Sequence, residues 1–363
     1  MKNFILILSF NILFVSLFSQ QYIARARIEK DWGYINQEGS WIINPQFEYV
    51  KDFSEGLAAI RSNGQWGFID KEGKFVINPQ FEETKDFHEG VAAVRNGKEW
   101  GFVDKAGKYI INPQFEDVRD FHNGFAAMRK NGEWGFMDKE GKFTINPQFQ
   151  KTMDFKDGLV VVLKDKKWGY VDKNGVWVIN PQFYKANSFN DKMAMVSMAG
   201  DWGFIDKNGR FVINPQFDNS HDFKNDYACV KKGKEWGYVD REGNYVINPQ
   251  FIDAMNFSED VAAVRVGKEW GYIDTDGKYT INPQFIKARD FHDGLAAVLK
   301  GKEWGFVDKT GNWVVNPQYE KVKDFSNGRA LVRKNGEWGW INKTGVYLIN
   351  PQFENAYSFV KVK

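Results

Sequence analysis

The stretch WGFIDKEGKFVINPQF, residues 66–81, returns with small changes every 34 residues from Trp32 to the C-terminus. The Trp-Gly pairs begin at positions 32, 66, 100, 134, 168, 202, 236, 270, 304 and 338 without a single insertion. A fixed internal period is the signature of a repeat array, which grows as one body and not as separate domains. We therefore expect ten repeats in one continuous domain over residues 22–363.

Within each period the sequence predicts an antiparallel hairpin. Residues 57–61 (LAAIR) form a short apolar run, and Asn63-Gly64 is a strong signal for a two-residue hairpin turn. Residues 66–70 then resume with aromatic and β-branched side chains, which are typical of a strand. These segments are the first two strands of the repeat.

A turn and a third strand complete the predicted meander. Asp70 and Gly73 occupy the first and fourth positions of a type I turn, and residues 75–77 continue as a strand. Pro79 is expected to end this strand, because proline has no N–H to donate to a sheet. Residues 81–87 place apolar side chains at spacings of three, so we expect an ordered connector with room for one helical turn.

Both faces of this meander are apolar. In the second strand Trp66 and Phe68 point one way, while Gly67 and Ile69 point the other. An isolated three-stranded unit would leave one apolar face in water, so every unit must lie between two neighbours. We expect Gly67 to leave room for an aromatic ring of the adjacent unit.

Two architectures bury both faces of every unit. The first is an open, curved, solenoid-like array of ten stacked antiparallel β-meanders, and the second is a closed β-propeller. Ten units exceed the usual four to eight blades, and three strands fall short of the usual four. The first predicted strand covers residues 23–27 and the chain ends after a connector, so no strand is evidently exchanged between the termini. We therefore favour the all-β open array, with the closed propeller as the alternative.

The complete repeat resembles the WG-containing repeat family of bacterial proteins. Trp-Gly, Asp-x-x-Gly, Pro-Gln-aromatic and Glu-Gly-Leu-Ala occur in one order at one spacing, and the resemblance covers residues 23–363. It implies a β-rich repeat domain, commonly in exported proteins, without shared catalytic residues. The chain departs from the pattern at Lys192, Asp226 and Asp260, which replace the glycine found at the position of Gly56.

The N-terminus has the pattern of a secretory signal peptide. Lys2 precedes the largely apolar run of residues 4–18, and the chain turns polar at Ser19. An uncleaved membrane anchor is the alternative, although this run is short for a bilayer span. We expect residues 1–21 to be removed, no transmembrane segment thereafter, and an exported protein in the periplasm, at the cell surface or outside the cell.

Composition argues against several classes of function. Lys plus Arg number 49 against 47 for Asp plus Glu, and the two signs are interspersed, so we expect no nucleic-acid partner. All 34 glycines fall at four recurring positions of the repeat, which leaves no separate glycine-rich loop for a phosphate. The aromatic residues that recur in every copy are interpreted as core.

Neither metal binding nor catalysis is indicated. Asp274 and Asp276 come nearest to a calcium loop but lack the further ligands, and Asn36 and Asn342 stand where other copies have the turn Asp. This position is better explained by hydrogen bonding within the turn. Like groups spaced along an array do not form the convergent set of unlike groups that catalysis requires. We expect no catalytic residue, no metal and no cofactor.

Function is then expected to lie in a surface. The leading hypothesis is a noncatalytic exported scaffold, a monomer that binds another protein or a cell-envelope component, with glycan binding as the alternative and an enzyme third. The position of Glu48 is acidic in six copies but becomes Tyr184, Ile252 and Ile286, with Asp218 between them. These apolar residues are either a partner footprint or a local repacking of the connector.

Overall fold

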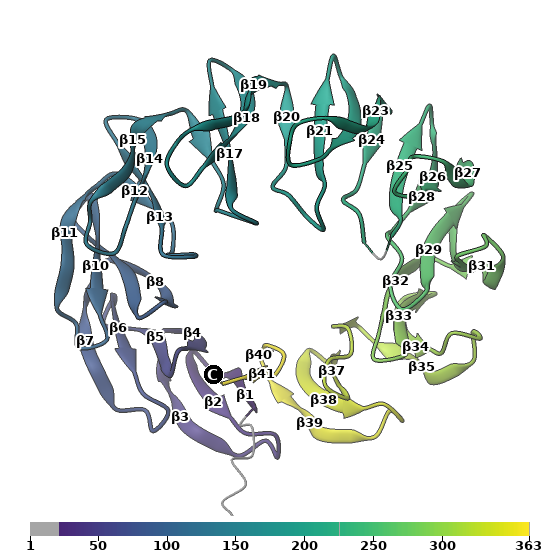
Figure 1. Ribbon diagram of the computed structural model, residues 1–363. Helices are drawn as coiled ribbons and strands as arrows, with labels where there is room; N and C mark the ends of the chain where they lie inside the picture. The colour runs from purple at the N-terminus through teal and green to yellow at the C-terminus, as the bar shows by residue number, and fades with distance from the viewer. Residues whose placement is uncertain (1–21, 225, 363) are drawn as a thin grey trace, which may run out of the picture.

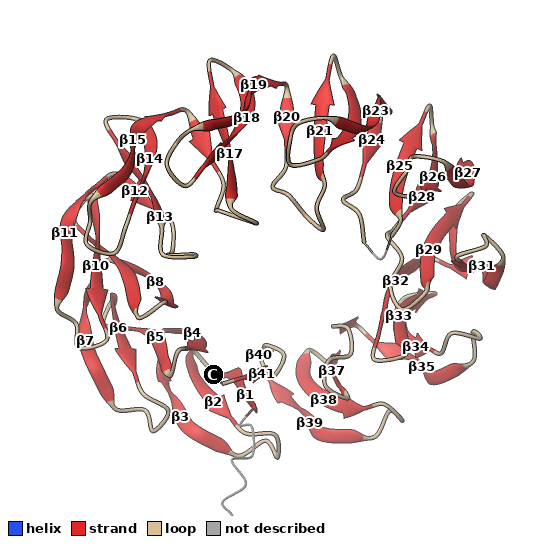
Figure 2. Cartoon of the chain, in the orientation of Figure 1, coloured by secondary structure: helices blue, strands red, loops and turns tan. Residues whose placement is uncertain are grey.

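The computed structural model describes residues 22–224 and 226–362, in which the secondary structure is extended throughout. The strands of these ranges form ten sheets arranged in a closed ring, a ten-bladed β-propeller (Figures 1 and 2). No helix in the described part of the chain is long and apolar enough to cross a membrane. The predicted signal peptide, residues 1–21, lies outside the described residues.

Each blade is a sheet of four antiparallel strands that follow one another from the centre of the ring outward (Figure 1). The innermost strands are β40 (Asn355–Ala356), β4 (Tyr49–Ser54), β8 (Glu83–His88), β12 (Asp117–Val118), β16 (Lys151–Thr152), β20 (Lys185–Ala186), β24 (Asn219–Ser220), β28 (Asp253–Ala254), β32 (Lys287–His292) and β36 (Lys321–Val322). The second strands are β1 (Tyr22–Ile28), β5 (Leu57–Ser62), β9 (Val91–Asn96), β13 (Ala126–Lys130), β17 (Leu159–Lys164), β21 (Ala194–Met198), β25 (Ala228–Lys232), β29 (Val261–Val266), β33 (Leu295–Lys300) and β37 (Arg329–Lys334).

The third and outermost strands complete the blades. The third strands are β2 (Asp31–Ile35), β6 (Gln65–Ile69), β10 (Glu99–Asp104), β14 (Glu133–Met137), β18 (Lys167–Asp172), β22 (Asp201–Ile205), β26 (Glu235–Val239), β30 (Glu269–Asp274), β34 (Glu303–Val307) and β38 (Glu337–Asn342). The outermost strands are β3 (Trp41–Phe47), β7 (Phe75–Phe81), β11 (Tyr109–Phe115), β15 (Phe143–Phe149), β19 (Trp177–Phe183), β23 (Phe211–Phe217), β27 (Tyr245–Phe251), β31 (Tyr279–Phe285), β35 (Trp313–Tyr319) and β39 (Tyr347–Phe353). A further short strand, β41 (Val360–Lys361), pairs with β1.

The expected connector is in fact the innermost strand, so each blade has four strands and not three. In β4, Val50 pairs with Ile60 and Phe53 pairs with Ala58, and the register shifts between these two pairs. The irregularity brings both Val50 and Phe53 into the core despite their spacing of three. A bulge in a strand therefore produces the spacing that we interpreted as room for a helical turn.

The ring is closed by exchange of a strand between the two ends of the chain. β40 and β41 at the C-terminus pair with β1, so that Ala26 lies opposite Ala356 and Tyr22 opposite Lys361. Figure 1 shows the two ends of the coloured chain side by side. The preference for an open array is therefore wrong and the alternative, a closed propeller, is confirmed, because the unrecognised fourth strand supplies the latch.

Each blade buries both faces against its neighbours, as the sequence predicts. In β5, Ala58 and Ile60 belong to the core shared with the preceding blade, whereas Leu57 and Ala59 belong to the core shared with the following one. The alternation follows from the period of two in a strand. The core of the ring is thus a series of interfaces between successive blades.

The glycine of each Trp-Gly pair is required by the backbone of its own blade. A Cβ on Gly67 would lie 2.5 Å from the carbonyl oxygen of Ile77 and 2.6 Å from the nitrogen of Pro79. β7 runs on through Pro79, and its register with β6 shifts on both sides of the Phe68 pair. The predictions that Gly67 faces a ring of the next unit and that Pro79 ends the strand are both wrong, since a bulged edge strand tolerates proline.

Candidate interaction surface

The two ends of the ring carry different turns. The hairpins between the second and third strands, such as residues 62–65, lie at one end, which we call the hairpin rim. The turns between the first and second strands and between the third and fourth strands lie at the other end, the turn rim. This separation follows from antiparallel pairing, because successive turns alternate between the two ends of a sheet.

On the turn rim, the Asp of the Asp-x-x-Gly turn is engaged by its own backbone. Oδ1 of Asp70 accepts hydrogen bonds from the backbone N–H groups of Glu72 and Lys74, at 3.1 and 2.8 Å. Asn36 makes the equivalent two bonds in the first copy. This is the hydrogen-bonding role that the sequence indicates. Among the described residues, no group of three His, Cys, Asp or Glu side chains is placed to hold a metal ion.

On the hairpin rim, the position of Glu48 caps the hairpin of its own blade. The carboxylate of Glu48 accepts a hydrogen bond from the backbone N–H of Gly64 at 3.0 Å. Glu116 binds Gly132 in the same way at 3.1 Å. Most copies therefore have a polar residue at this position because it accepts a hydrogen bond from the hairpin, and not only because it faces solvent.

Tyr184, Ile252 and Ile286 occupy this capping position without a capping group. Their side chains are 59%, 47% and 49% exposed, so they are not part of the core. They lie on three different blades of the hairpin rim, and Nζ of Lys167 lies 3.1 Å from the centroid of the Tyr184 ring. Asp218, on the blade between the first two, caps its hairpin through Gly233. The structure places the three apolar side chains along one arc of the rim.

Two pockets that the sequence did not predict lie between blades on the same rim. One, of about 550 Å³, is lined by Trp270, Ile286, Arg289 and Trp304, among others. The next, of about 440 Å³, shares Arg289 and Trp304 and continues to Trp338. The guanidinium carbon of Arg289 lies 5.2 Å from the ring centroid of Trp304. The two pockets form one rim groove of half-buried indole rings and cations.

The signal for this groove was present in the sequence but was assigned to the core. Every copy has Trp at the start of its third strand, and a residue required in every copy is most simply interpreted as buried. In the structure Trp32, Trp100 and Trp236 are buried, whereas Trp270 and Trp304 are half-buried. The extent of their exposure depends on which side chains flank them, and the repeat pattern does not carry that information.

Ion pairs that involve the innermost strands cross from blade to blade, one of them with Arg25 on β1. Nε of Arg25 lies 2.7 Å from Oδ1 of Asp52, and Nζ of Lys51 lies 3.8 Å from Oδ1 of Asp86. Burial raises the pKa of Asp52 and that of Asp86 above the ordinary value, although the neighbouring cations oppose the shift. These pairs join neighbouring blades near the centre of the ring.

The chain belongs to the WG containing repeat family. A model of that repeat matches ten consecutive segments, residues 32–66, 66–100, 100–134, 134–168, 168–200, 202–236, 236–270, 270–304, 304–338 and 338–361. The ring is thus ten copies of one family repeat. A comparison with curated proteins gives no match.

Solved structures with related backbones are distant in sequence. A eukaryotic initiation factor is 13% identical with a TM-score of 0.56, over 94% of this chain and 98% of that one. The dihydro-heme d1 dehydrogenase NirN is 14% identical with a TM-score of 0.43, over 94% and 75%. PorZ, a type-IX secretion component of Porphyromonas gingivalis, is 9% identical with a TM-score of 0.29, over 86% and 52%. The likeness to the initiation factor shows the fold alone.

Proposed function

We propose that this chain is a noncatalytic, exported interaction scaffold that binds another protein or a cell-envelope component through its hairpin rim. The observation that carries the proposal is the replacement of hairpin-capping acids by exposed Tyr184, Ile252 and Ile286 on one arc of the rim. Exposed apolar side chains grouped on one part of a surface often mark a contact with a partner. The propeller fold supports the same function, because a ring of repeats presents an extended surface on a rigid frame.

A triple substitution tests this proposal. Changing Tyr184, Ile252 and Ile286 together to Glu is expected to reduce capture of the envelope partner at least tenfold, as the loss of two or three interface anchors would. The melting temperature should stay nearly unchanged, because all three side chains are exposed. The measurement is a pull-down from envelope extract with the purified mature chain.

A matched control uses the same position on other blades. Glu82, Glu116 and Glu320 are changed together to Gln, which removes three charges from the hairpin rim but none from the apolar arc. Capture by this control should equal that of the wild type. Undiminished capture by the Glu triple variant, or a sharp fall in its melting temperature, would contradict the proposed footprint.

Glycan binding is the second candidate, and the rim groove is the observation that favours it. Indole faces stack against the apolar faces of sugar rings, and the half-buried Trp270, Trp304 and Trp338 recur from blade to blade beside Arg289. Incubation with immobilised polysaccharides, run beside the pull-down, separates the two functions. Glycan binding that is lost in a Trp304→Ala variant but kept in a Tyr184→Glu, Ile252→Glu double variant, which leaves the groove residue Ile286 in place, would favour the second candidate.

A further inference from the structure

A clasp on the turn rim ties one blade to the next at several places in the ring. The carboxylate of Glu55 in the β4–β7 blade accepts a hydrogen bond from the backbone N–H of Gly90 in the β8–β11 blade, at 2.8 Å. The same carboxylate lies 3.4 Å from Nζ of Lys105, which also donates to the backbone carbonyl oxygen of Glu55 at 2.8 Å. One acid thus engages a glycine N–H and a lysine, both from the following blade.

The clasp recurs around the ring, with the cation always 50 residues after the acid and Arg241 in place of lysine after Asp191. Glu89 lies 3.2 Å from Lys139 and accepts from the N–H of Gly124, and Glu259 lies 3.7 Å from Lys309. Where the acid is replaced by Asn225 or Asn327, the cation 50 residues on is replaced as well, by Thr275 or by Gln37 across the closure of the ring. In these two copies the acid and the cation are lost together.

Lys173 departs from this rule, as does Lys71, which follows Gln21 by 50 residues. The residue 50 positions before Lys173 is Asn123, which brings no carboxylate, yet the lysine is retained. Among the described residues, Lys173 makes no ion pair, and the N–H of Gly158, the counterpart of Gly90, has no acceptor. The two donors that hold a carboxylate elsewhere in the ring are both present here, and the carboxylate is missing.

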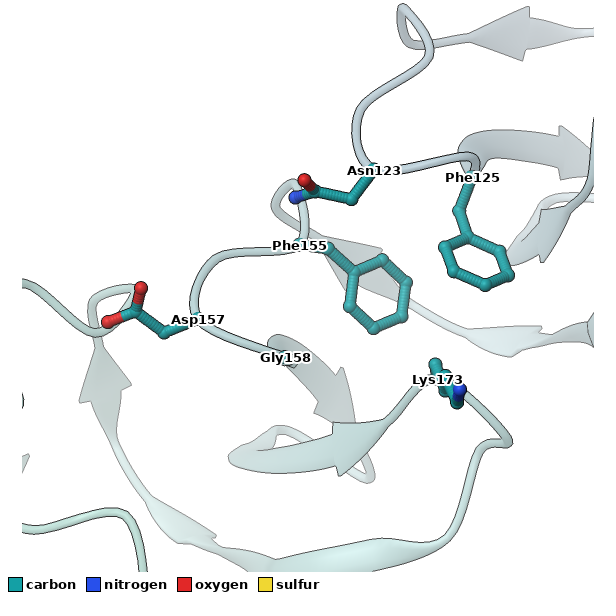
Figure 3. A pocket seen from close by; sticks show the side chains of 6 residues that line it. All are labelled: Asn123, Phe125, Phe155, Asp157, Gly158 and Lys173. Atoms are coloured by element: carbon teal, nitrogen blue, oxygen red, sulfur yellow. The ribbon is translucent and has the colours of Figure 1, made fainter.

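A pocket lies at this place. It has a volume of about 480 Å³ and is lined by Asn123, Phe125, Phe155, Asp157, Gly158 and Lys173 (Figure 3). The aromatic rings of Phe125 and Phe155 lie 5.4 Å apart and form one wall, with Lys173 beneath them. The carboxylate of Asp157 points away from these rings and lies 3.8 Å from Nζ of Lys207 in the next blade.

The aromatic wall is also a departure from the repeat. The position of Phe125 is Leu57, Val91, Leu159 and Leu295 in other copies, and Tyr227 where Thr275 replaces the clasp cation. This blade therefore combines a large, flat side chain with the unpaired lysine. Phe125 is only partly buried, whereas Phe155 belongs to the core between the β12–β15 and β16–β19 blades. The two departures, at Asn123 and Phe125, meet in the same pocket.

We propose that this pocket binds a carboxylate that is attached to an apolar, preferably aromatic, group. The ligand carboxylate takes the place that Glu55 occupies in its own clasp, accepting from Lys173 and from the N–H of Gly158. Its apolar group lies against Phe125 and Phe155. This inference is independent of the hairpin rim, since the pocket is at the other end of the ring.

Titration of the full mature chain with 3-phenylpropanoate, followed by calorimetry, tests the proposal. We expect saturable binding of one equivalent, and no comparable binding of 3-phenylpropan-1-ol, which lacks the charge. Lys173→Gln should weaken binding about tenfold or more, the effect of removing one charge-assisted hydrogen bond. Lys309→Gln is the matched control, because that lysine already has Glu259 as its partner, and it should leave binding unchanged.

The most specific variant is Asn123→Glu, which copies Glu55 into this blade. It is expected to abolish binding and to raise the melting temperature, because the new carboxylate completes the clasp from within the chain. If the folded Asn123→Glu variant still bound 3-phenylpropanoate with wild-type affinity, the proposal would be overturned. So would equal affinity for the acid and the alcohol.

A free acid and the C-terminus of a polypeptide both supply such a carboxylate, and a second titration distinguishes these sources. The probe is acetyl-Gly-Gly-Phe with a free carboxylate, compared with the same peptide as its amide. Tighter binding of the peptide acid than of 3-phenylpropanoate assigns the site to a chain terminus, and the reverse assigns it to a small acid. Failure of both acids to bind would refute the proposed site without affecting the function proposed for the hairpin rim.

Discussion

The β4–β7 blade and the closing blade have the same architecture but are built from different parts of the chain. The first is continuous from Tyr49 to Phe81, whereas the closing blade takes β40 from the C-terminus and β1–β3 from the N-terminal repeat. Their registers correspond, since Ala58 lies opposite Ile69 in one and Ala24 opposite Ile35 in the other. The sequence repeat and the blade are therefore offset by one strand, and this offset allows ten copies to close into a ring.

The closing blade also has contacts that the ordinary blade lacks. The guanidinium carbon of Arg25 lies 3.8 Å from the ring centroid of Tyr357, and Nη1 of Arg329 donates to the carbonyl oxygen of Gln37 at 2.7 Å. Beside them, Phe359 packs against Trp340 with ring centroids 5.2 Å apart, the counterpart of the Phe87–Phe68 contact in the ordinary blades. The junction between the ends is thus a packed core and not only a pair of edge strands.

Removal of the latch is expected to have the largest effect. A chain that ends at Phe353 loses β40, β41 and the ring of Phe359, which exposes Trp340 and the inner edge of β1. Its free energy of unfolding should fall by more than the roughly 3–5 kcal/mol that truncation of one buried Phe costs. Urea unfolding followed by tryptophan fluorescence measures the loss.

Rescue in trans supplies the control for this truncation. A synthetic peptide of residues 354–363 should restore part of the lost stability, because its strands can pair with β1. A truncated chain that unfolds at the wild-type urea concentration would mean that the C-terminal strands do not hold the ring.

A smaller effect is expected from an added methyl group at the Trp-Gly glycines. A Cβ on Gly33 would lie 2.4 Å from the carbonyl oxygen of Ile43, and one on Gly67 would lie 2.5 Å from that of Ile77. Gly33→Ala in the closing blade and Gly67→Ala in the ordinary blade should each cost about 1–3 kcal/mol, the usual range for overpacking. Urea unfolding of both variants checks the prediction. If Gly33→Ala alone left the free energy of unfolding unchanged, the closing blade would not share the bulge.

The smallest effect concerns the pH dependence of the inter-blade clasp. Burial raises the pKa of Glu55, but hydrogen bonds from the backbone N–H groups of Gly90 and Glu89, together with Lys105, outweigh it and lower the pKa below the ordinary value of 4.5. A lowered pKa stabilises the fold fully above the ordinary value, and this contribution is lost as the pH falls through the lowered one.

Comparison of two amide variants across pH measures this contribution. The Glu55→Gln chain should melt below the wild type at pH 7, and the difference should shrink as the pH falls below about 4.5, the ordinary pKa. Asn123→Gln, in the blade without a clasp acid, should show no such trend. A difference at Glu55 that persists unchanged at low pH would mean that the charge is not what the clasp uses.

The sequence was sufficient to predict the repeat, the family, the strands of the hairpin and the burial of both faces. These features follow from period and pattern, which act within one copy. Closure of the ring could not be predicted from the period and pattern. It depends on whether residues such as Val50 and Phe53 form a strand, and their spacing of three is atypical of a strand because a bulge lies between them. The role of Gly67 was missed for a similar reason, since the approaching backbone at Pro79 comes from another strand.

The candidate sites were predictable only where they break the repeat. Tyr184, Ile252 and Ile286 are visible as departures at one position, and their exposure is a matter of the fold. Asn123 and Lys173 are visible only when positions 50 residues apart are compared, because the clasp joins a turn of one blade to a different turn of the next. The partners of a clasp lie in different repeats, so neither position alone reveals the pairing.

Cross-linking across the junction of the two ends tests the central claim most directly. Arg27 lies opposite Asn355 in the β1–β40 pair, at a separation that suits a disulfide. The double variant Arg27→Cys, Asn355→Cys is expected to form an intramolecular disulfide under mild oxidation, as a monomer that migrates differently on non-reducing gels. A second double variant, Arg61→Cys with Asn355→Cys, places the first cysteine at the equivalent position of the next blade and should stay reduced. Formation of neither bond in the folded monomer would contradict the closed ring and restore the open array.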